Sequence, residues 1–496
     1  MYIGIDLGTS GVKVVLTDEQ GAVLRTTHAS LDVSMPRALW SEQDPADWWE
    51  ATCQCLDALK ASQDLSTVKA IGLSGQMHGA TLLDENGDVL RPAILWNDGR
   101  CDDECHEIEA AVSDARQRSG NIVMAGFTAP KILWIKHHEP DVYRRIHKVL
   151  LPKDYLRYKL TGEFASEMSD AAGTIWLNTE SRKWDSTLLA ATGLNESHMP
   201  ALFEGNAVTG ELTASLAERW GMKSVPVAGG GGDNAAGAIG CGIVDPGQAM
   251  LSLGTSGVYF AVTDTFRINT EQAVHSFCHA LPSRWHMMSV MLSAASCLQW
   301  YAAQSGYEDV GAMLDDVEQS VSYSDEATPL FLPYLTGERT PHNNPYAKAA
   351  FFGVTASTTR AHLARAVIEG VSMALADGMD AVHQSGVSVS SISLIGGGAK
   401  SPFWRQLLSD ISGQTLTYRK GGDVGPALGA ARLAQLAVNP DKSLSDICFQ
   451  PEAEAEYKPD PKVNEAYLAK RQQFRELYYA IEPFWSSPKK QKTFTN

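Results

Sequence analysis

Short apolar segments separated by glycine-rich or polar turns open the chain. Residues 1–7 and 12–16 have the alternation and the β-forming residues typical of strands, and residues 8–11 between them read Gly-Thr-Ser-Gly. The polar residues 18–21 predict a second turn, after which a third strand follows. The pattern therefore predicts an antiparallel meander of three strands whose first turn is rich in glycine.

The opening unit occurs a second time about half a chain further on. The letters LGTSGV occupy residues 7–12 and again residues 253–258. Around the second copy, residues 249–253 and 258–262 repeat the two strands. A six-residue identity at this spacing is improbable by chance, and it indicates two related lobes that each begin with the same unit.

Later segments combine strands, glycine runs and helices. A strand over 225–228 leads into four glycines and then Asp233, where a helix begins. Another strand ends at residues 396–398, which are all glycine, and Ser401 then caps a helix. A strand–glycine–helix unit of this kind allows a nucleotide to lie against bare backbone. Apolar residues at helical spacing also predict a long core helix over 359–381.

Composition excludes several classes of protein. The 496 residues are too many for one ordinary core, so two or three domains are expected. The formal charge of −17 disfavours binding to nucleic acid or to an anionic membrane surface. The N-terminus lacks the basic and apolar regions of a signal peptide, and no apolar run is long enough to cross a membrane. We therefore expect a cytoplasmic protein that binds neither nucleic acid nor membrane.

The eight cysteines are scattered through the chain without a CxxC pair. Cys101, Cys105 and His106 lie close together in the sequence, but no second ligand pair follows at the spacing of a zinc site. Reduced thiols in a cytosolic protein are the simpler interpretation.

The two Gly-Thr-Ser-Gly turns are the first candidates for a ligand-binding site. Each presents backbone N–H groups and two hydroxyls in a small space, which suits phosphate oxygens. A single such turn is more often a polar hairpin, but two copies at symmetric positions favour two sides of one triphosphate site. No GxxxxGK[ST] loop occurs, so any ATP must be bound by these turns. The candidate residues are Gly8, Thr9, Ser10, Gly254, Thr255 and Ser256.

The two copies differ just before the turn, where the first has Asp6 and the second has Ser252. A carboxylate at one phosphate turn only is what a Mg²⁺–nucleotide site needs, because Mg²⁺ keeps several waters and takes one or two carboxylates. We expect Asp6 to orient the hydrated metal through water, and capping of the turn backbone is the alternative.

Asp233 is a carboxylate at a helix start that the preceding glycines keep accessible. On local grounds, a plain helix cap is an equally good interpretation. Gly230, Gly232 and Ala235 also match the loose dinucleotide-binding pattern, which needs an acidic residue about 20 residues later. Residues 248–258 contain no such residue, so a dehydrogenase is disfavoured.

Two polar clusters follow strands, where ligand sites are commonly built. One follows a strand over 68–73, and the other begins at Trp96 and includes Arg100, which we interpret as a structural ion-pair partner. A lone histidine is more often structural than functional, yet His78 with a flexible neighbour suits a polyol. The candidate polyol-binding residues are Gln76, Met77, His78, Trp96, Asn97, Asp98 and Asn234.

At this point the chain resembles a known family. The paired turns are similar to the phosphate loops of the superfamily of actin, heat-shock ATPases and sugar kinases. Residues 126–139 (GFTAPKILWIKHHE) are similar to the N-lobe signature of the FGGY carbohydrate kinases, although His137 departs from it. Residues 351–370 (FFGVTASTTRAHLARAVIEG) are similar to the C-lobe signature. The resemblance covers residues 1–440 with its motifs in the same order.

The resemblance implies a fold of two α/β lobes with ribonuclease-H-like cores, of the actin/sugar-kinase type, and a cleft between them. Residues 1–241 are expected to form a sugar-binding lobe and residues 242–440 a nucleotide-binding lobe. Residues 441–496 are expected to form a C-terminal extension with helical packing and a polar end from Lys489 to Asn496. ATP and Mg²⁺ are the implied cofactors, and a homodimer is the implied assembly.

Within the family, four segments resemble the members that phosphorylate D-xylulose. They are GQMHG (75–79), WNDGR (96–100), GGGDNAAGA (230–238) and SLGTSGVYF (252–260). The implied reaction converts ATP and D-xylulose to ADP and D-xylulose 5-phosphate. Asp233 is then the general base that accepts the proton of the attacking hydroxyl.

The resemblance also assigns the binding residues. Met77 and His78 become sugar contacts, and Gly397, Gly398 and Ser401 border the adenosine. Two alternatives remain open. One is a kinase for gluconate or another ketose, because gluconate kinases share the Met-His pair. The other is a non-catalytic, actin-like ATP-binding protein.

Overall fold

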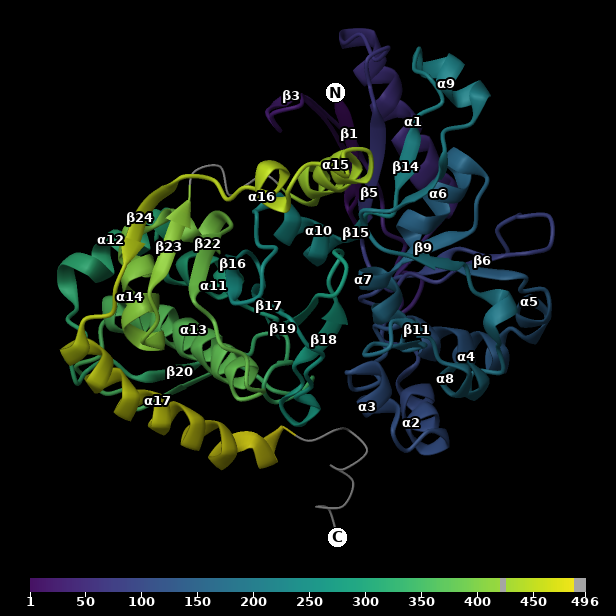
Figure 1. Ribbon diagram of the computed structural model, residues 1–496. Helices are drawn as coiled ribbons and strands as arrows, with labels where there is room; N and C mark the ends of the chain where they lie inside the picture. Colours follow the sequence, from purple (N-terminus) through teal and green to yellow (C-terminus); the bar gives the residue numbers. More distant parts are fainter. Residues whose placement is uncertain (420–424, 486–496) are drawn as a thin grey trace.

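The computed structural model describes residues 1–419 and 425–485, which form two α/β lobes side by side (Figure 1). The predicted polar end, Lys489 to Asn496, lies outside the described residues. Across the described residues, no helix combines the length and the apolar character that crossing a membrane requires.

The first lobe is built on a seven-stranded sheet whose strand order is β13-β14-β5-β1-β2-β3, with β15 also paired to β5. The first three strands form the predicted antiparallel meander, and β5 runs parallel to β1 on its other side. The bounds are β1 Tyr2–Leu7, β2 Gly11–Thr17, β3 Val23–Ser30, β5 Ala70–Gly75, β13 Val208–Glu211, β14 Pro226–Ala228 and β15 Gly231–Gly232.

The second lobe repeats this arrangement in a seven-stranded sheet of order β18-β19-β17-β16-β22-β23-β24. Strand β16 pairs with β17 antiparallel and with β22 parallel, as β1 does with β2 and β5. The repeat predicted from the sequence is thus confirmed in the strand pairing. The bounds are β16 Gln248–Leu253, β17 Gly257–Thr263, β18 His275–Cys278, β19 Trp285–Met291, β22 Ser391–Ile395, β23 Leu416–Arg419 and β24 Ala453–Tyr457.

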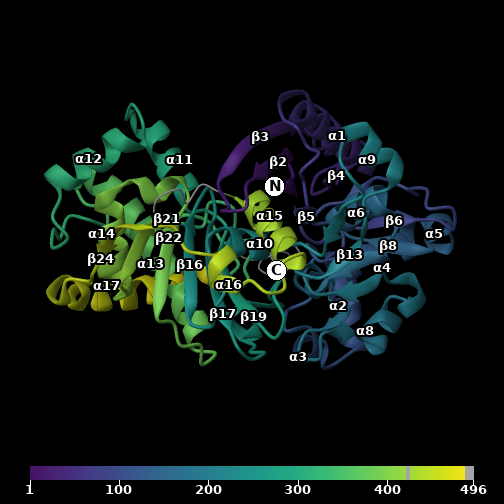
Figure 2. The same cartoon turned by 45° about the horizontal axis from the view of Figure 1, so that its top comes forward.

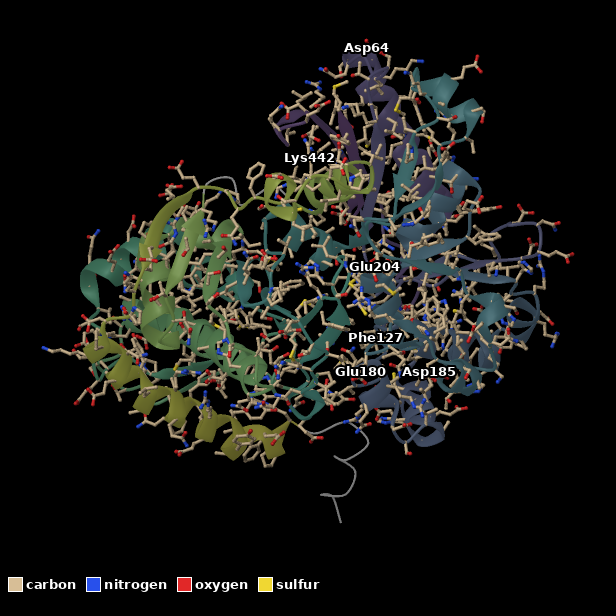
Figure 3. All side chains as sticks on the ribbon, in the orientation of Figure 1. Asp64, Phe127, Glu180, Asp185, Glu204 and Lys442 are labelled. Atoms are coloured by element: carbon tan, nitrogen blue, oxygen red, sulfur yellow. The ribbon has the colours of Figure 1, made fainter. Side chains whose placement is uncertain are left out.

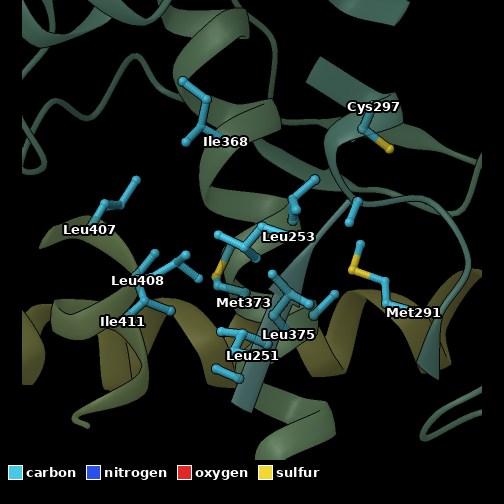
Figure 4. Close-up of a cluster of buried hydrophobic side chains, with 14 of the residues drawn as sticks. Leu251, Leu253, Met291, Cys297, Ile368, Met373, Leu375, Leu407, Leu408 and Ile411 are labelled. Atoms are coloured by element: carbon cyan, nitrogen blue, oxygen red, sulfur yellow. The ribbon is translucent and has the colours of Figure 1, made fainter. Parts of the chain in front are cut away.

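Helices cover both sheets and complete the two cores. The predicted core helix over 359–381 is α13 (Arg360–His383), which Thr359 caps and whose side chains fill the core of the second lobe (Figure 4). The other main helices are α1 Pro45–Ser62, α4 Thr128–His138, α6 Pro152–Thr161, α7 Met168–Ala171, α10 Asp233–Gly240, α11 Ala295–Ser305, α12 Val310–Ser320, α14 Pro402–Ser412, α15 Pro426–Ala437 and α17 Pro461–Ile481.

Helix α15 differs from the sequence-based division into lobes. It belongs to the segment 242–440 that we assigned to the second lobe, yet it packs against β1, β5 and α10 of the first lobe (Figures 1 and 2). The backbones touch: a Cβ at Gly4, Gly72 or Gly429 would overlap a carbonyl oxygen across this contact. The contact ties the two halves of the chain together.

The C-terminal extension is part of the second lobe's architecture. Strand β24 adds an antiparallel strand next to β23, and α17 packs against α14 and α13. The sequence predicted the helical packing of this extension but not its strand.

The glycines of the α10–α15 contact provide a test of this packing. We expect Gly429→Ala to lower the free energy of unfolding by about 1–3 kcal/mol or more, because its Cβ has no space beside the Ala236 carbonyl. Thermal and denaturant unfolding measure this loss. Gly237→Ala, on α10 itself, is the matched control: its Cβ would meet only Pro426 Cγ, at 3.9 Å, so stability should stay equal or rise. Equal stability of both variants would contradict the packing.

Candidate active site

Three parallel strand ends meet at one edge of the first sheet. Asp6 of β1 lies opposite Ser74 of β5, and Gly231 of β15 lies on the other side of the same Ser74. The loop 76–78 leaves the end of β5, and α10 starts directly after β15 with Asp233. The sequence-predicted residues Asp6, Gln76, Met77, His78, Asp233 and Asn234 are therefore brought to one edge. Ligand sites in parallel sheets form at such carboxyl ends.

Asp233 and Asp6 are neighbouring carboxylates, and the charge of Asp6 acts on Asp233. Burial, and after it the negative charge of Asp6, raise the pKa of Asp233 to about 7. Burial raises the pKa of Asp6 to about 6. One Asp233 oxygen, Oδ1, accepts hydrogen bonds from the Asn234 backbone N–H at 2.7 Å and from Asn234 Nδ2 at 2.9 Å. Among residues 1–419 and 425–485, Oδ2 has no hydrogen-bond partner and is open to a ligand, and a base with this pKa is matched to neutral pH.

Asp6 Oδ1 is buried and has no hydrogen-bond partner within the described residues. An unsatisfied buried carboxylate oxygen is costly unless a ligand, water or ion completes it. Hard cations that retain water ligands, such as Mg²⁺, suit an oxygen of this type. The donor chemistry at Asp6 therefore fits the water-mediated metal contact that the sequence predicted.

The glycine run before Asp233 is held by close backbone contacts. Gly230 has φ = +76°, and a Cβ there would overlap the Leu73 carbonyl. A Cβ at Gly232 would lie 2.9 Å from Met77 Cγ. The Gly232 N–H donates to Ser169 Oγ at 3.1 Å. These contacts fix the start of α10 and hence the direction of Asp233.

His78 is a neutral acceptor at this edge. Burial, followed by the positive charge of Lys131, lowers its pKa to about 3. Its Nδ1 lies 2.6 Å from the Gly173 carbonyl oxygen, which can only accept, so Nδ1 carries the proton. Nε2 is then a bare acceptor for a hydroxyl. Met77 packs beside it against Gly173 and Gly232.

Gln76 and Trp96 contact the first phosphate turn. Gln76 Oε1 accepts from Thr9 Oγ1 at 3.0 Å, and Trp96 Nε1 donates to the same hydroxyl at 3.0 Å. Gln76 Nε2 is also used, since it donates to Gln43 Oε1 at 2.9 Å. These two predicted sugar contacts therefore position Thr9, and their own polar groups are already bonded.

Asp98 corrects the sequence prediction. Its side chain is buried; Oδ2 accepts from Arg100 Nη2 and from the Ser41 N–H, both at 2.6 Å, and Oδ1 accepts from Arg100 Nε at 2.9 Å. Oδ1 also accepts from the Arg100 backbone N–H at 2.9 Å, so in this structure both oxygens are engaged within the protein instead of being open to a sugar hydroxyl. Arg100 has the structural role that we expected. The neighbouring Asn97 is exposed.

Each of the two Gly-Thr-Ser-Gly turns is closed by a backbone hydrogen bond and has side chains exposed at its tip. The Gly8 N–H donates to the Gly11 carbonyl at 3.0 Å, and the Gly254 N–H donates to the Ser256 carbonyl at 3.1 Å. The carbonyls of Gly254 and Thr255 accept from the first N–H groups of α11, which anchors the second turn. Side chains at the tips, Ser10, Thr255 and Ser256, remain exposed.

A cavity of about 420 Å³ lies in the second lobe and includes Gly397, Gly398 and Ser401. Ser401 Oγ caps α14 by accepting from the Trp404 N–H at 3.3 Å. The volume lies in the range of small-molecule sites. Sequence reasoning missed the other lining residues, because apolar residues of a pocket-lining helix have the same spacing as core residues. They are Ala295, Leu298, Gln299, Val310, Gly311, Leu314, Asp315, Lys400, Pro402 and Trp404.

The chain is similar to known proteins over nearly its whole length. Residues 1–240 match the N-terminal domain of the FGGY family of carbohydrate kinases, and residues 249–438 match its C-terminal domain. The chain is 59% identical over 484 residues to a xylulose kinase from Escherichia coli (strain K12), covering 97% of this chain and 99% of that protein. It is 55% identical over 487 residues to a xylulose kinase from Klebsiella pneumoniae, covering 98% and 100%.

A solved structure described as a xyloylose kinase from Brucella ovis superposes with a TM-score of 0.93 at 45% identity, covering 97% of this chain and 99% of that chain. The fold class predicted from the sequence, two α/β lobes of the actin/sugar-kinase type, is confirmed by this likeness. The chain belongs to the FGGY family of carbohydrate kinases.

Proposed function

We propose that this chain transfers the γ-phosphoryl group of ATP to D-xylulose, giving D-xylulose 5-phosphate and ADP. The observation that carries the proposal is Asp233, a carboxylate at the strand edge whose pKa is raised to about 7 beside Asp6. The near full-length identity to xylulose kinases supports the choice of sugar. Two alternatives compete with this proposal. One is phosphorylation of gluconate or another ketose, and the other is ATP binding without turnover.

In the proposed reaction, the unbonded oxygen of Asp233 accepts the proton of the attacking sugar hydroxyl. The hydroxyl oxygen forms a bond to the γ-phosphorus, the bond from that phosphorus to the β-γ bridging oxygen breaks, and ADP leaves. The turns at Gly8–Ser10 and Gly254–Ser256 hold phosphate oxygens through backbone N–H groups. Bound Mg²⁺ would neutralise phosphate charge, and Asp6 would hold its water ligands.

The sugar is held on the first lobe. His78 Nε2 accepts from one hydroxyl, Met77 supplies an apolar contact, and the Asn234 amide is free to bind another hydroxyl through its oxygen, since its Nδ2 already donates to Asp233. The nucleoside occupies the cavity at Gly397, Gly398 and Ser401 on the second lobe.

We also propose a cytoplasmic homodimer, as the family resemblance implies. All eight cysteines are buried and unpaired, which is consistent with a reducing compartment. Size-exclusion chromatography with light scattering measures the assembly.

Coupled ADP release with D-xylulose, D-ribulose, L-ribulose, gluconate and glycerol tests the reaction. We expect the highest kcat/KM for D-xylulose and a loss of about 10²- to 10⁴-fold in Asp233→Asn, because the proton acceptor is removed. Asp64→Asn is the matched control: Asp64 lies at the tip of the first lobe, far from the site, and activity should be unchanged (Figure 3). A higher kcat/KM for another sugar would show that D-xylulose is not the preferred substrate. Full activity of Asp233→Asn would show that Asp233 is not the general base.

The Asp6–Asp233 pair predicts a pH effect. Asp233 acts when deprotonated, so kcat/KM should rise with pH through about 7. Asp6→Asn removes a negative charge that raises the pKa of Asp233. The rise of kcat/KM with pH should therefore occur at lower pH in this variant, while the overall rate falls. The pH dependence of the residual rate measures the shift. A rise that stays at the same pH would show that the carboxylates do not interact.

Gly397 offers a way to fill the nucleoside cavity without strain. A Cβ there meets no atom within 4 Å, so the backbone has room for a side chain at this position, and we expect Gly397→Val to fold. We expect KM for ATP to rise on the order of tenfold, because the valine occupies space that the nucleoside needs. KM for the sugar and the melting temperature should not change. An unchanged KM for ATP would place the nucleoside elsewhere.

A further inference from the structure

Lys131 lies within residues 126–139, the segment that resembles the family signature, and the reaction proposed above gives it no part. Its side chain is fully buried in α4, next to the candidate site. Nζ donates to the His78 carbonyl oxygen and to the Gly126 carbonyl oxygen, each at 2.8 Å. Within residues 1–419 and 425–485, no carboxylate lies at ion-pair distance from it, and a buried lysine without such a partner is costly.

The residue that Lys131 holds has an unusual backbone. His78 has φ = +69°, which lies in the left-handed region that residues other than glycine adopt infrequently, so this conformation needs support from the surrounding structure. Its carbonyl accepts a second hydrogen bond from Thr128 Oγ1 at 3.2 Å. Two donors from the start of α4 therefore hold the carbonyl of His78 in this conformation.

The same segment of chain also holds the His78 ring. Phe127 packs edge-on against the imidazole with ring centroids 4.7 Å apart, and it also contacts His275 and Phe277 of β18 in the second lobe. Figure 3 shows Phe127 on the side of the first lobe that faces the second lobe. Gly173 leaves space for the ring, since a Cβ there would lie 2.6 Å from His78 Cε1. Backbone and ring are thus both held, and Nε2 makes no hydrogen bond within the part of the chain that the structure describes.

Charge acts in the same direction. Lys131 from α4 and Arg339 from the second lobe are the charged groups that disfavour a protonated His78 ring, after burial itself. A neutral ring with its proton on Nδ1 presents Nε2 as an acceptor only. It therefore favours a sugar that directs a hydroxyl donor to this point.

We infer that Lys131 is a positioning residue: it fixes His78 so that Nε2 accepts from one sugar hydroxyl, and it thereby sets which ketose the site prefers. This inference rests on the proposed function, because it assigns the sugar contact of the same site.

Lys131→Met tests the inference, because methionine has a similar length and no donor. Burial lowers the pKa of Lys131 to about 7, so the donor is only partly charged at neutral pH, and loss of its hydrogen bond corresponds to about a two- to tenfold change. We expect KM for D-xylulose to rise by about that factor, with KM for ATP unchanged and a reduced preference for D-xylulose over D-ribulose. Thr128→Val, which removes the second donor to His78, should change the same parameters in the same direction by a smaller factor, and it replaces Lys131→Met if that variant does not fold.

Ile132→Val is the matched control for a general loss of stability. Ile132 is a fully buried neighbour on the same helix, so this variant should lose some stability while both KM values stay the same. A Lys131→Met variant that lowers the melting temperature but leaves sugar KM and ketose preference unchanged would overturn the inference.

A readout without turnover separates the inference from the proposed function. The ¹⁵N signals of the His78 ring, whose proton the Gly173 carbonyl keeps on Nδ1 in both proteins, should be a single sharp set in the wild type and displaced or broadened in Lys131→Met, because the backbone that carries the ring has lost a donor. Unchanged shifts would overturn the role of Lys131 even if D-xylulose is the substrate. A wild type that turns over no D-xylulose would refute the proposed function alone, and the ring shifts would still decide the role of Lys131.

Discussion

The parallel pairing of β5 with β1 on one side and β15 on the other is the constraint on which the site depends. It places Asp6 and Asp233 near each other although they are far apart in the sequence. Helix α15 stabilises this arrangement because its backbone lies directly against Gly4 and Gly72 on the strands. Since α15 lies in the chain between β23 and β24 of the second lobe, the position of the site depends on both halves of the molecule.

Burial gives the polar groups of the site their chemistry. It raises the pKa of both carboxylates toward neutrality and lowers that of His78, so the site has a proton acceptor poised near neutral pH and an uncharged hydroxyl acceptor. Supporting bonds come from residues outside the reaction, such as Ser169 to Gly232 and Lys131 to His78. These buried hydrogen bonds hold the groups of the site in a fixed geometry.

Much of this was predictable from the sequence because it is local. The LGTSGV repeat, the meander, the glycines before Asp233 and the cap at Ser401 each depend on a few adjacent residues. What the sequence did not predict depends on distant contacts: α15 crossing to the first sheet, Asp98 bonded to the Ser41 backbone, and the helices that line the cavity. Lys131 showed no local sign of its contact with His78, since its partner is a backbone carbonyl on another loop.

The central claim is that the sugar lies between His78 and Asp233 with its reacting hydroxyl on the base. A crystal structure with D-xylulose and a non-hydrolysable ATP analogue tests it most directly through two distances. The account predicts that the hydroxyl on carbon 5 lies about 2.6–3.2 Å from an Asp233 carboxylate oxygen and that His78 Nε2 accepts from another hydroxyl. A sugar bound with that hydroxyl away from Asp233, or with no contact to His78, would contradict the account.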